Sequence, residues 1–187
     1  MARTPSTMIP LGITAPDFSL PDTVSGKTTS LRDLQGEVGT VIMFICNHCP
    51  FVKHVNTELI KLAHDYPPEK ISFIAISSND VDAYPEDGPE KMKEVAQQLL
   101  YPFPYLFDET QAVAKAYDAA CTPDFFVFDS TLSLVYRGQL DDSRPGNTIP
   151  VSGKDIRQTL DALLSGKSIP TEQKPSIGCN IKWKNMG

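Results

Sequence analysis

The most regular feature of the sequence is the change between continuous apolar runs and stretches with helical spacing. Residues 40–45 are apolar after the first position, which is typical of a strand buried on both faces of a sheet, and residues 71–76 have the same character. Between these runs, apolar residues recur every three or four positions in residues 51–66. That spacing predicts an amphipathic helix that starts at Pro50 and ends before Pro67.

The middle of the chain repeats the alternation of strand and helix. An apolar stripe in residues 92–100 predicts a further helix, and we expect Asp87 to cap its start. Residues 104–107 predict a short strand. Asp108 is then expected to cap a helix that runs to Tyr117.

The last strands and helix follow from turn and cap signals. Residues 125–128 and 132–136 predict two strands joined as a hairpin by a short polar turn. Ser152 and Asp155 form a capping pattern ahead of an apolar helical stripe, and Gly166 is placed to end that helix. The element order predicts an α/β fold with a central mixed sheet flanked by helices, since the late hairpin adds antiparallel strands to parallel ones.

The two ends of the chain look different from the middle. Residues 1–16 are expected to be irregular, and residues 17–34 predict an N-terminal β-hairpin around a Ser-Gly turn. We expect one domain over residues 1–166. Residues 167–187 then form a C-terminal tail, which Trp183 would anchor to the domain.

Composition narrows the class of protein. The chain has 187 residues, 41% of them hydrophobic, which suits one globular domain. Its net charge of −6 argues against a nucleic-acid partner and against a basic membrane anchor. No apolar run approaches the roughly 20 residues of a membrane-spanning helix, and the N-terminus lacks the apolar core of a secretory signal. We therefore expect a cytoplasmic protein without membrane or nucleic-acid partners.

The strongest chemical signal is Cys46-Asn47-His48-Cys49-Pro50, which falls between a predicted buried strand and a predicted helix. Sites in open α/β sheets gather where strands end. The backbone N–H groups and the dipole at a helix N-terminus stabilise an anion such as a thiolate. Two cysteines at this spacing can close a disulfide, which points to redox chemistry.

The position of each cysteine suggests its role. We expect Cys46 to be the more exposed and to attack a partner disulfide, and Cys49 inside the first helical turn to resolve the mixed disulfide. A protonated His48 would stabilise the Cys46 thiolate and make the pair more oxidising. Asn47 and Pro50 would share in tuning and positioning the pair.

Other interpretations of the cysteines remain open from sequence. Cys46 and Cys49 can be a buried core pair, or ligands of a metal ion, but zinc needs about four ligands and the other two cysteines stand alone. No metal and no bound cofactor are therefore expected. Cys121 is either a third thiol near the pair or a buried small hydrophobe, with burial favoured. Cys179 in the tail can pair with Cys121, remain a thiol or contact a partner.

Several motifs together resemble the thioredoxin-fold superfamily on its peroxiredoxin-like (redoxin, AhpC/TSA) side, over roughly residues 10–165. The segments that carry this resemblance are 15–20, 26–34, the C-x-x-C-P of 46–50, 121–129, and the tail 175–183. The resemblance implies a thioredoxin-like fold. It also implies a cis peptide before Pro123, with the Thr122 backbone beside the active cysteine, where it can pair with a substrate strand.

Departures from the family pattern bear on the reaction. The residues between the cysteines differ from the Gly-Pro of thioredoxins, and His before the second cysteine is similar to oxidising members. By the same resemblance Cys49 aligns with the peroxidatic cysteine of peroxiredoxins, but Cys46 stands where they need Thr or Ser, and Ile42 where they need proline. Arg137 is a displaced candidate for their activating arginine. Peroxidase chemistry is therefore expected to be lost.

These observations predict a thiol-disulfide oxidoreductase that cycles Cys46 and Cys49 between dithiol and disulfide. Its partners would be protein or small-molecule thiols and disulfides, with a reductase to recycle it. The alternatives are a thiol-dependent peroxidase with an antioxidant role, and a redox-inert thioredoxin-fold binding module.

Overall fold

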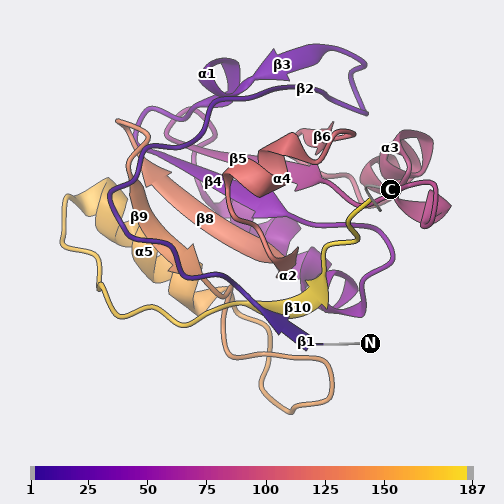
Figure 1. The fold of residues 1–187 in the computed structure, drawn as a ribbon. Coiled ribbons are helices and arrows are strands. Elements are labelled where there is room, and N and C mark those ends of the chain that lie inside the picture. Colours follow the sequence, from indigo (N-terminus) through magenta and orange to yellow (C-terminus); the bar gives the residue numbers. More distant parts are fainter. Residues whose placement is uncertain (1–2, 185–187) are drawn as a thin grey trace.

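A central sheet of five strands organises the chain, in the order β6-β5-β4-β8-β9 (Figure 1). The structure, a computed structural model, describes residues 3–184. The strands of this sheet are β4 (Gly39–Phe44), β5 (Ile71–Ser77), β6 (Tyr105–Phe107), β8 (Asp124–Asp129) and β9 (Leu134–Gly138). Strand β4 pairs in parallel with β5 and antiparallel with β8, so that Ile42 lies between Ile74 and Phe126. The sheet is therefore mixed, and the prediction of its class and of the late hairpin is confirmed.

Helices cover both faces of the sheet. Successive side chains of β4 point to opposite faces and are apolar on both, so each face needs a cover. On one face, Val41 and Met43 pack in a core with residues of α2 (Pro50–Asp65), α3 (Pro89–Gln98) and α5 (Lys154–Ser165). On the other, Ile42 and Phe44 pack in a second core with residues at α4 (Ala112–Ala116), at the short helix α1 (Leu31–Leu34) and in the N-terminal hairpin. That hairpin consists of β2 (Ser19–Pro21) and β3 (Thr28–Ser30).

The two ends of the described chain form a second, smaller sheet. Strand β10 (Ile177–Asn180) lies between β1 (Arg3–Pro5) and β7 (Cys121–Thr122), and both pairings are antiparallel. Figure 1 shows β10 and β1 side by side below the main sheet. The expectation of an irregular N-terminus therefore fails at Arg3–Pro5 and holds for residues 6–13, which form no helix or strand. The segment after residue 166 contributes a strand to the fold rather than only a tail.

Gly178 explains how closely β10 approaches β7. A Cβ atom at this position would lie 2.0 Å from the Thr122 carbonyl oxygen, so only glycine fits. The neighbouring Ser176 adds side-chain anchors, since its Oγ donates to the Pro123 carbonyl and its amide donates to Ser6 Oγ. The C-terminal strand is thus held against the segment that leads into β8.

Two predicted helix caps are wrong. Gly88, not Asp87, is the N-cap of α3, and Asp87 ends a short 3-10 helix, η1 (Pro85–Asp87), with its side chain buried. Gly153 is the N-cap of α5, and the Ser152 side chain makes no cap there. The amides of these two residues donate to Asp141 instead, because its carboxylate lies within 2.7 Å of both.

Two other predictions about helix ends are confirmed, one of them only in part. Gly166 ends α5 in the left-handed conformation at φ +64°, as expected for a C-terminal glycine. Asp108 precedes the start of α4 and does not occupy the cap position, which belongs to Gln111, but its carboxylate accepts from the Ala114 amide at 2.9 Å. The helix is shorter than predicted and ends at Ala116.

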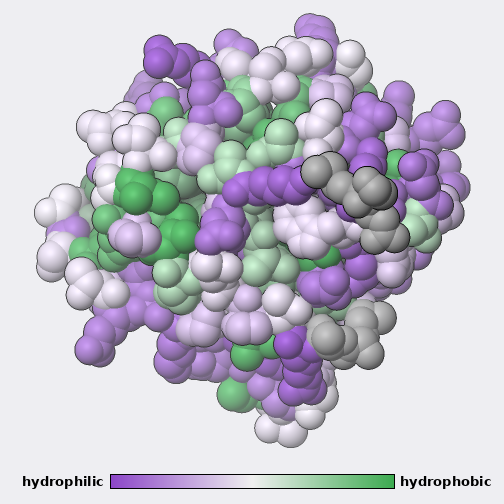
Figure 2. All heavy atoms as spheres, in the orientation of Figure 1, coloured by the Kyte–Doolittle hydropathy of each residue, from purple (hydrophilic) through white to green (hydrophobic). Residues whose placement is uncertain are grey.

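Polar side chains cover most of the face seen in Figure 1, with apolar side chains in smaller groups among them (Figure 2). Trp183 is one of the partly exposed apolar residues, and the Lys115 ammonium lies 5.8 Å from the centre of its ring. Within residues 3–184, every helix is too short or too polar to cross a membrane.

Candidate active site

The Cys46–Pro50 motif lies where β4 ends and α2 begins. Strand β4 ends at Phe44, Cys49 is the N-cap of α2, and Pro50 occupies the first helical turn. A proline is favoured there because its missing N–H would have no partner in the helix. Both cysteines are buried, with exposed fractions of 2% for Cys46 and 0% for Cys49. Cys46 is therefore more exposed than Cys49 by only 2%, and both cysteines are shielded from solvent.

Thr122 contacts both cysteines from a different part of the chain. Its peptide bond to Pro123 is cis, the isomer that the resemblance implies. The Cys49 Sγ lies 3.2 Å from the Thr122 carbonyl oxygen, and the Thr122 Oγ1 lies 3.5 Å from the Cys46 Sγ. The fold therefore brings together the cysteine pair and the segment that the sequence singled out.

His48 is held by the carboxylate of Asp87, which the sequence had suggested as a helix cap. Its Nδ1 lies 2.6 Å from Asp87 Oδ2 and 3.9 Å from Cys46 Sγ, and its ring stacks on Tyr84 at 5.2 Å between centroids. Asp87 Oδ1 accepts from the backbone amides of Asn47 at 2.8 Å and His48 at 3.2 Å. Because Asp87 is fully buried, these contacts fix the loop between the two cysteines.

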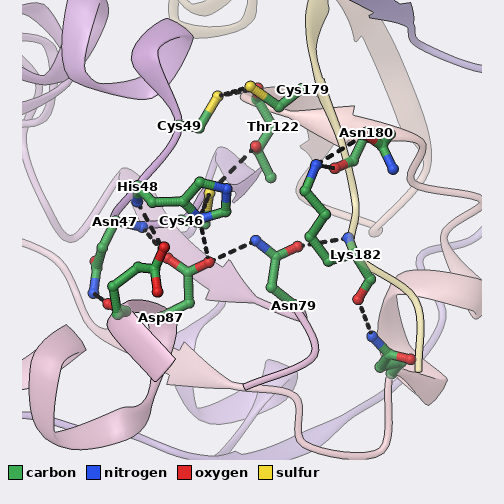
Figure 3. A network of polar contacts seen from close by, with 12 residues as sticks. Cys46, Asn47, His48, Cys49, Asn79, Asp87, Thr122, Cys179, Asn180 and Lys182 are labelled. Atoms are coloured by element: carbon green, nitrogen blue, oxygen red, sulfur yellow. Dashed lines mark hydrogen bonds and ion pairs between the residues drawn. The ribbon is translucent and has the colours of Figure 1, made fainter. Parts of the chain in front are cut away.

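Asp87 also links the cysteine loop to the C-terminal segment (Figure 3). Asn79 donates to Asp87 Oδ2 at 2.8 Å, and its Oδ1 accepts from the backbone amide of Lys182 at 2.8 Å. The Asn47 side chain completes the enclosure on the other side, since it donates to the Glu86 carbonyl. A continuous polar network thus runs from the motif to the residues just after β10.

Cys179 is the residue whose place in the fold the sequence left open. Its Sγ lies 2.8 Å from Cys49 Sγ, and the two sulfurs point toward each other in Figure 3. Strand β10 aligns Cys179 with Thr122 across the β7 pairing. The chain's own strand therefore pairs with Thr122, the residue whose backbone the resemblance offers to a substrate strand.

The electrostatics of the pair differ from the expected thiolate on Cys46. A hydrogen bond from the Cys46 thiol lowers the pKa of Cys49 to about 5, and further hydrogen bonds from Cys179 and Thr122 and from the Val52 amide act in the same direction against the effect of burial. The pKa of Cys46 is raised, first because it gives this hydrogen bond, then by burial and by the Asp87 charge. Burial and the contact with Cys49 raise the pKa of Cys179 to about 12. In the reduced protein, Cys46 and Cys49 therefore form a pair that gives up one proton easily and holds the second one.

A model of the AhpC/TSA family matches residues 11–137. The chain belongs to this family. The match covers the N-terminal hairpin, the cysteine motif, and strands β4 to β8, so it contains Cys46, Cys49 and Thr122. Cys179 lies beyond it.

Solved structures similar to this AhpC/TSA chain agree with its fold. An uncharacterised conserved protein of Geobacillus kaustophilus is 62% identical over 100% of this chain and 99% of its own, with a TM-score of 0.98. A hypothetical protein of Sinorhizobium meliloti 1021 is 47% identical over 97% of this chain and 99% of its own, with a TM-score of 0.94. A candidate thioredoxin of Neisseria meningitidis is 25% identical over 81% of this chain and 89% of its own, with a TM-score of 0.62. Among curated protein sequences, none matches the chain.

Arg137 of this AhpC/TSA chain forms an ion pair with an aspartate, and none of the contacts described joins it to Cys46 or Cys49. Its guanidinium is fully buried and pairs with both carboxylate oxygens of Asp124, with an Nη2–Oδ2 distance of 2.8 Å. It also lies 3.9 Å above the centre of the Phe126 ring. These contacts make it a structural ion pair inside the sheet.

Cys121 is a buried thiol, as favoured from sequence. Its Sγ lies 3.6 Å from the Pro123 carbonyl, and its exposed fraction is 0%. Burial raises its pKa, as does the nearby Asp124. In the β10 register it lies opposite Asn180, so the Cys121–Cys179 pairing left open from sequence is not the one that the fold brings together.

Three groups of the site have donor atoms suited to a metal ion. The ligand atoms of Cys46, His48 and Asp87 all lie within 4.8 Å of one another. In the described part of the chain no further His, Cys, Asp or Glu joins this group, and a closed zinc site takes about four ligands. The His48 nitrogen that faces Cys46 is also the one that pairs with Asp87, so the set is already satisfied internally.

Proposed function

We propose that the protein is a thiol-disulfide oxidoreductase that cycles Cys46 and Cys49 between dithiol and disulfide. The observation that supports this most strongly is the placement of Cys46 and Cys49 at the start of α2, where the Thr122 Oγ1 lies 3.5 Å from the Cys46 Sγ and the pKa of Cys49 is lowered. A thiolate is the reactive form in disulfide exchange, and a pair with one shared proton supplies both a nucleophile and a base.

The reaction follows from this shared proton. Cys46 attacks one sulfur of the substrate disulfide as its proton passes to Cys49, the other member of the pair. The substrate S–S bond breaks, a mixed disulfide forms at Cys46, and the leaving sulfur takes the proton back from Cys49. The Cys49 thiolate then attacks Cys46 Sγ, which closes the Cys46–Cys49 disulfide and releases the second substrate sulfur as a thiolate.

His48 and Asp87 would tune this step by position. The Nδ1 atom of His48 lies 2.6 Å from the Asp87 carboxylate and 3.9 Å from the Cys46 sulfur, so a proton on Nδ1 can be held close to the attacking sulfur. The partners of the cycle would be a thiol or disulfide of a protein or small molecule, and a reductase or small thiol that regenerates the dithiol.

Peroxidase chemistry is the less favoured alternative. In this AhpC/TSA chain Cys46 occupies the position of the hydroxyl residue that would orient a peroxide, and Arg137 is held by Asp124. A redox-inert binding module is likewise less favoured, because a cysteine pair at the start of a helix, with a lowered pKa at Cys49, has the properties of a reactive dithiol.

The test is exchange with glutathione disulfide, followed by mass spectrometry. It is best run on a Cys179→Ser chain, because that removes the sulfur that lies 2.8 Å from Cys49. We expect this chain to form the Cys46–Cys49 disulfide and to release two equivalents of glutathione. Adding Cys49→Ser should leave a trapped glutathione adduct on Cys46, and adding Cys46→Ser should stop the release.

Cys121→Ser on the same chain is the matched control, since Cys121 is equally buried and contacts neither sulfur of the pair in the hydrogen bonds described. Full release of glutathione by the Cys46→Ser chain would refute the proposed roles.

A further inference from the structure

We propose that Cys179 is a third redox cysteine, which exchanges with the Cys46–Cys49 disulfide to form a Cys49–Cys179 disulfide. The proposal rests on the proposed dithiol cycle and extends it to a residue outside the matched family segment. It assigns a function to strand β10, which the cycle itself does not use.

The first support is the distance between the sulfurs. Cys49 Sγ and Cys179 Sγ are 2.8 Å apart, whereas a disulfide bond measures about 2.04 Å. The two atoms would need to approach by less than ~1 Å, which side-chain torsions can supply. Both residues are buried, with exposed fractions of 0% and 1%, so solvent does not separate them.

The second support is how firmly the fold holds Cys179 there. Residues on both sides of it are fixed: Gly178 packs on the Thr122 carbonyl, and the Ile181 amide donates to the Ala120 carbonyl at 3.2 Å. On the outer edge of β10, Arg3 of β1 pairs opposite Cys179. Because β10 pairs with β1 on one edge and with β7 on the other, the backbone of Cys179 is fixed in a position where its sulfur meets that of Cys49.

The exchange is balanced within the chain. Starting from the Cys46–Cys49 disulfide, the Cys179 sulfur attacks Cys49 Sγ and loses its proton. The Cys46–Cys49 bond breaks, the Cys49–Cys179 bond forms, and Cys46 leaves as a thiolate that takes up the proton. No electron leaves the protein, so the step needs no outside oxidant.

The charge distribution favours the step once the pair is oxidised. Part of the raised pKa of Cys179 comes from its contact with the Cys49 thiolate, after the larger effect of burial. That charge disappears when Cys49 enters a disulfide, so the attacking thiolate becomes easier to form. The result is an enzyme whose oxidised state is shared between two disulfides, one of which leaves Cys46 as a thiol beside His48.

Tryptic peptides separate the two disulfides cleanly. Cleavage after Arg32 and Lys53 places Cys46 and Cys49 in one peptide, residues 33–53, while Cys179 lies in residues 168–182, because trypsin does not cut before Pro175. A Cys46–Cys49 disulfide therefore stays within one peptide, and a Cys49–Cys179 disulfide joins two.

The experiment oxidises the reduced chain with one equivalent of diamide, quenches it with acid and N-ethylmaleimide, and maps the peptides. We expect the wild type to give both products, and Cys46→Ser to give the joined peptides 33–53 and 168–182 at least ~10-fold above any link to the Cys121 peptide. Cys121→Ser should leave the wild-type pattern unchanged, and Cys179→Ser should give only the internal disulfide.

The outcomes separate the two proposals. If the wild type gives no joined peptides while Cys179→Ser still closes the internal disulfide, Cys179 is not a redox cysteine and the dithiol cycle stands. If the joined peptides form but Cys179→Ser closes no internal disulfide, the dithiol cycle fails and the Cys49–Cys179 pairing alone survives. The wild-type arm needs no substitution, so the inference can be overturned even if a variant does not fold.

Discussion

Asp87 holds His48 at two points, through a 2.6 Å contact between Oδ2 and Nδ1 and through the His48 amide that donates to Oδ1. A single buried carboxylate thus sets both the backbone of the cysteine loop and the orientation of the ring beside Cys46. Charge-assisted contacts of this kind are stronger than neutral ones, and their loss in a buried site is costly. The loop between the cysteines therefore depends on a residue 39 positions away in the sequence.

Replacing Asp87 with asparagine should destabilise the protein by about 1–3 kcal/mol, because the new amide nitrogen would face the Asn79 amide, another donor. Urea unfolding of the reduced protein measures this. Glu86→Gln is the matched control, since that neighbouring side chain is exposed and should give a change within about 0.5 kcal/mol. Equal stability of Asp87→Asn and wild type would show that the clamp contributes nothing to the fold.

The ionisation of Cys49 gives a second prediction. Because its pKa is lowered to about 5, the reduced protein should keep thiolate absorbance near 240 nm from neutral pH down to about pH 5 and lose it below. Cys46→Ala removes the hydrogen bond that lowers this pKa most, so the loss of absorbance should move to higher pH, toward the ordinary cysteine value of about 8.5. Cys121→Ser should leave the transition in place. A transition that stays near pH 5 in Cys46→Ala would contradict the shared proton.

Arg137 should matter for stability and not for exchange. Arg137→Met leaves the buried Asp124 carboxylate without its partner, which typically costs 3–5 kcal/mol. Exchange with glutathione disulfide, corrected for the folded fraction, should stay within about twofold of wild type, since the guanidinium touches neither active cysteine in the contacts described. Arg32→Met, an exposed arginine, serves as the control for charge alone. A large loss of exchange in fully folded Arg137→Met would return this residue to the active site.

Gly178→Ala should open the site. The added Cβ would lie 2.0 Å from the Thr122 carbonyl oxygen, so β10 must move away from β7 and uncover Cys49. We expect native-state alkylation of Cys49 by iodoacetamide to become at least ~10-fold faster than in wild type, read from the modified peptide. The unfolding free energy, measured in parallel, separates local opening from global loss of structure. Unchanged alkylation would mean that β10 does not cover this sulfur.

The local pattern of the sequence was sufficient to predict the main sheet and to place the cysteine pair at the start of a helix. The apolar runs predicted β4 and β5, and the change from strand to helix placed Cys49 and Pro50 at the start of α2. These features depend on neighbours in sequence, so periodicity and cap chemistry can reveal them.

The remaining features depend on contacts that no local pattern contains. Asp87 lies among acidic residues that look solvated, and only Pro89, which suits a helix start after Gly88, signals that Asp87 is not the cap. Cys179 meets Cys49 across 130 positions. Short strands such as β10, with four residues, have too little periodicity to predict, and their pairing is set by tertiary packing.

The most direct test of the dithiol cycle compares two oxidants on the same reduced protein. Stoichiometric hydrogen peroxide and glutathione disulfide are added in separate stopped-flow experiments, and the first product of each is mapped. The cycle predicts a reaction with peroxide at about the rate of free cysteine, and exchange with glutathione disulfide that ends in a disulfide of Cys49. Reaction with peroxide orders of magnitude faster than free cysteine, with a sulfenic acid as the first product, would contradict it and identify a peroxidase.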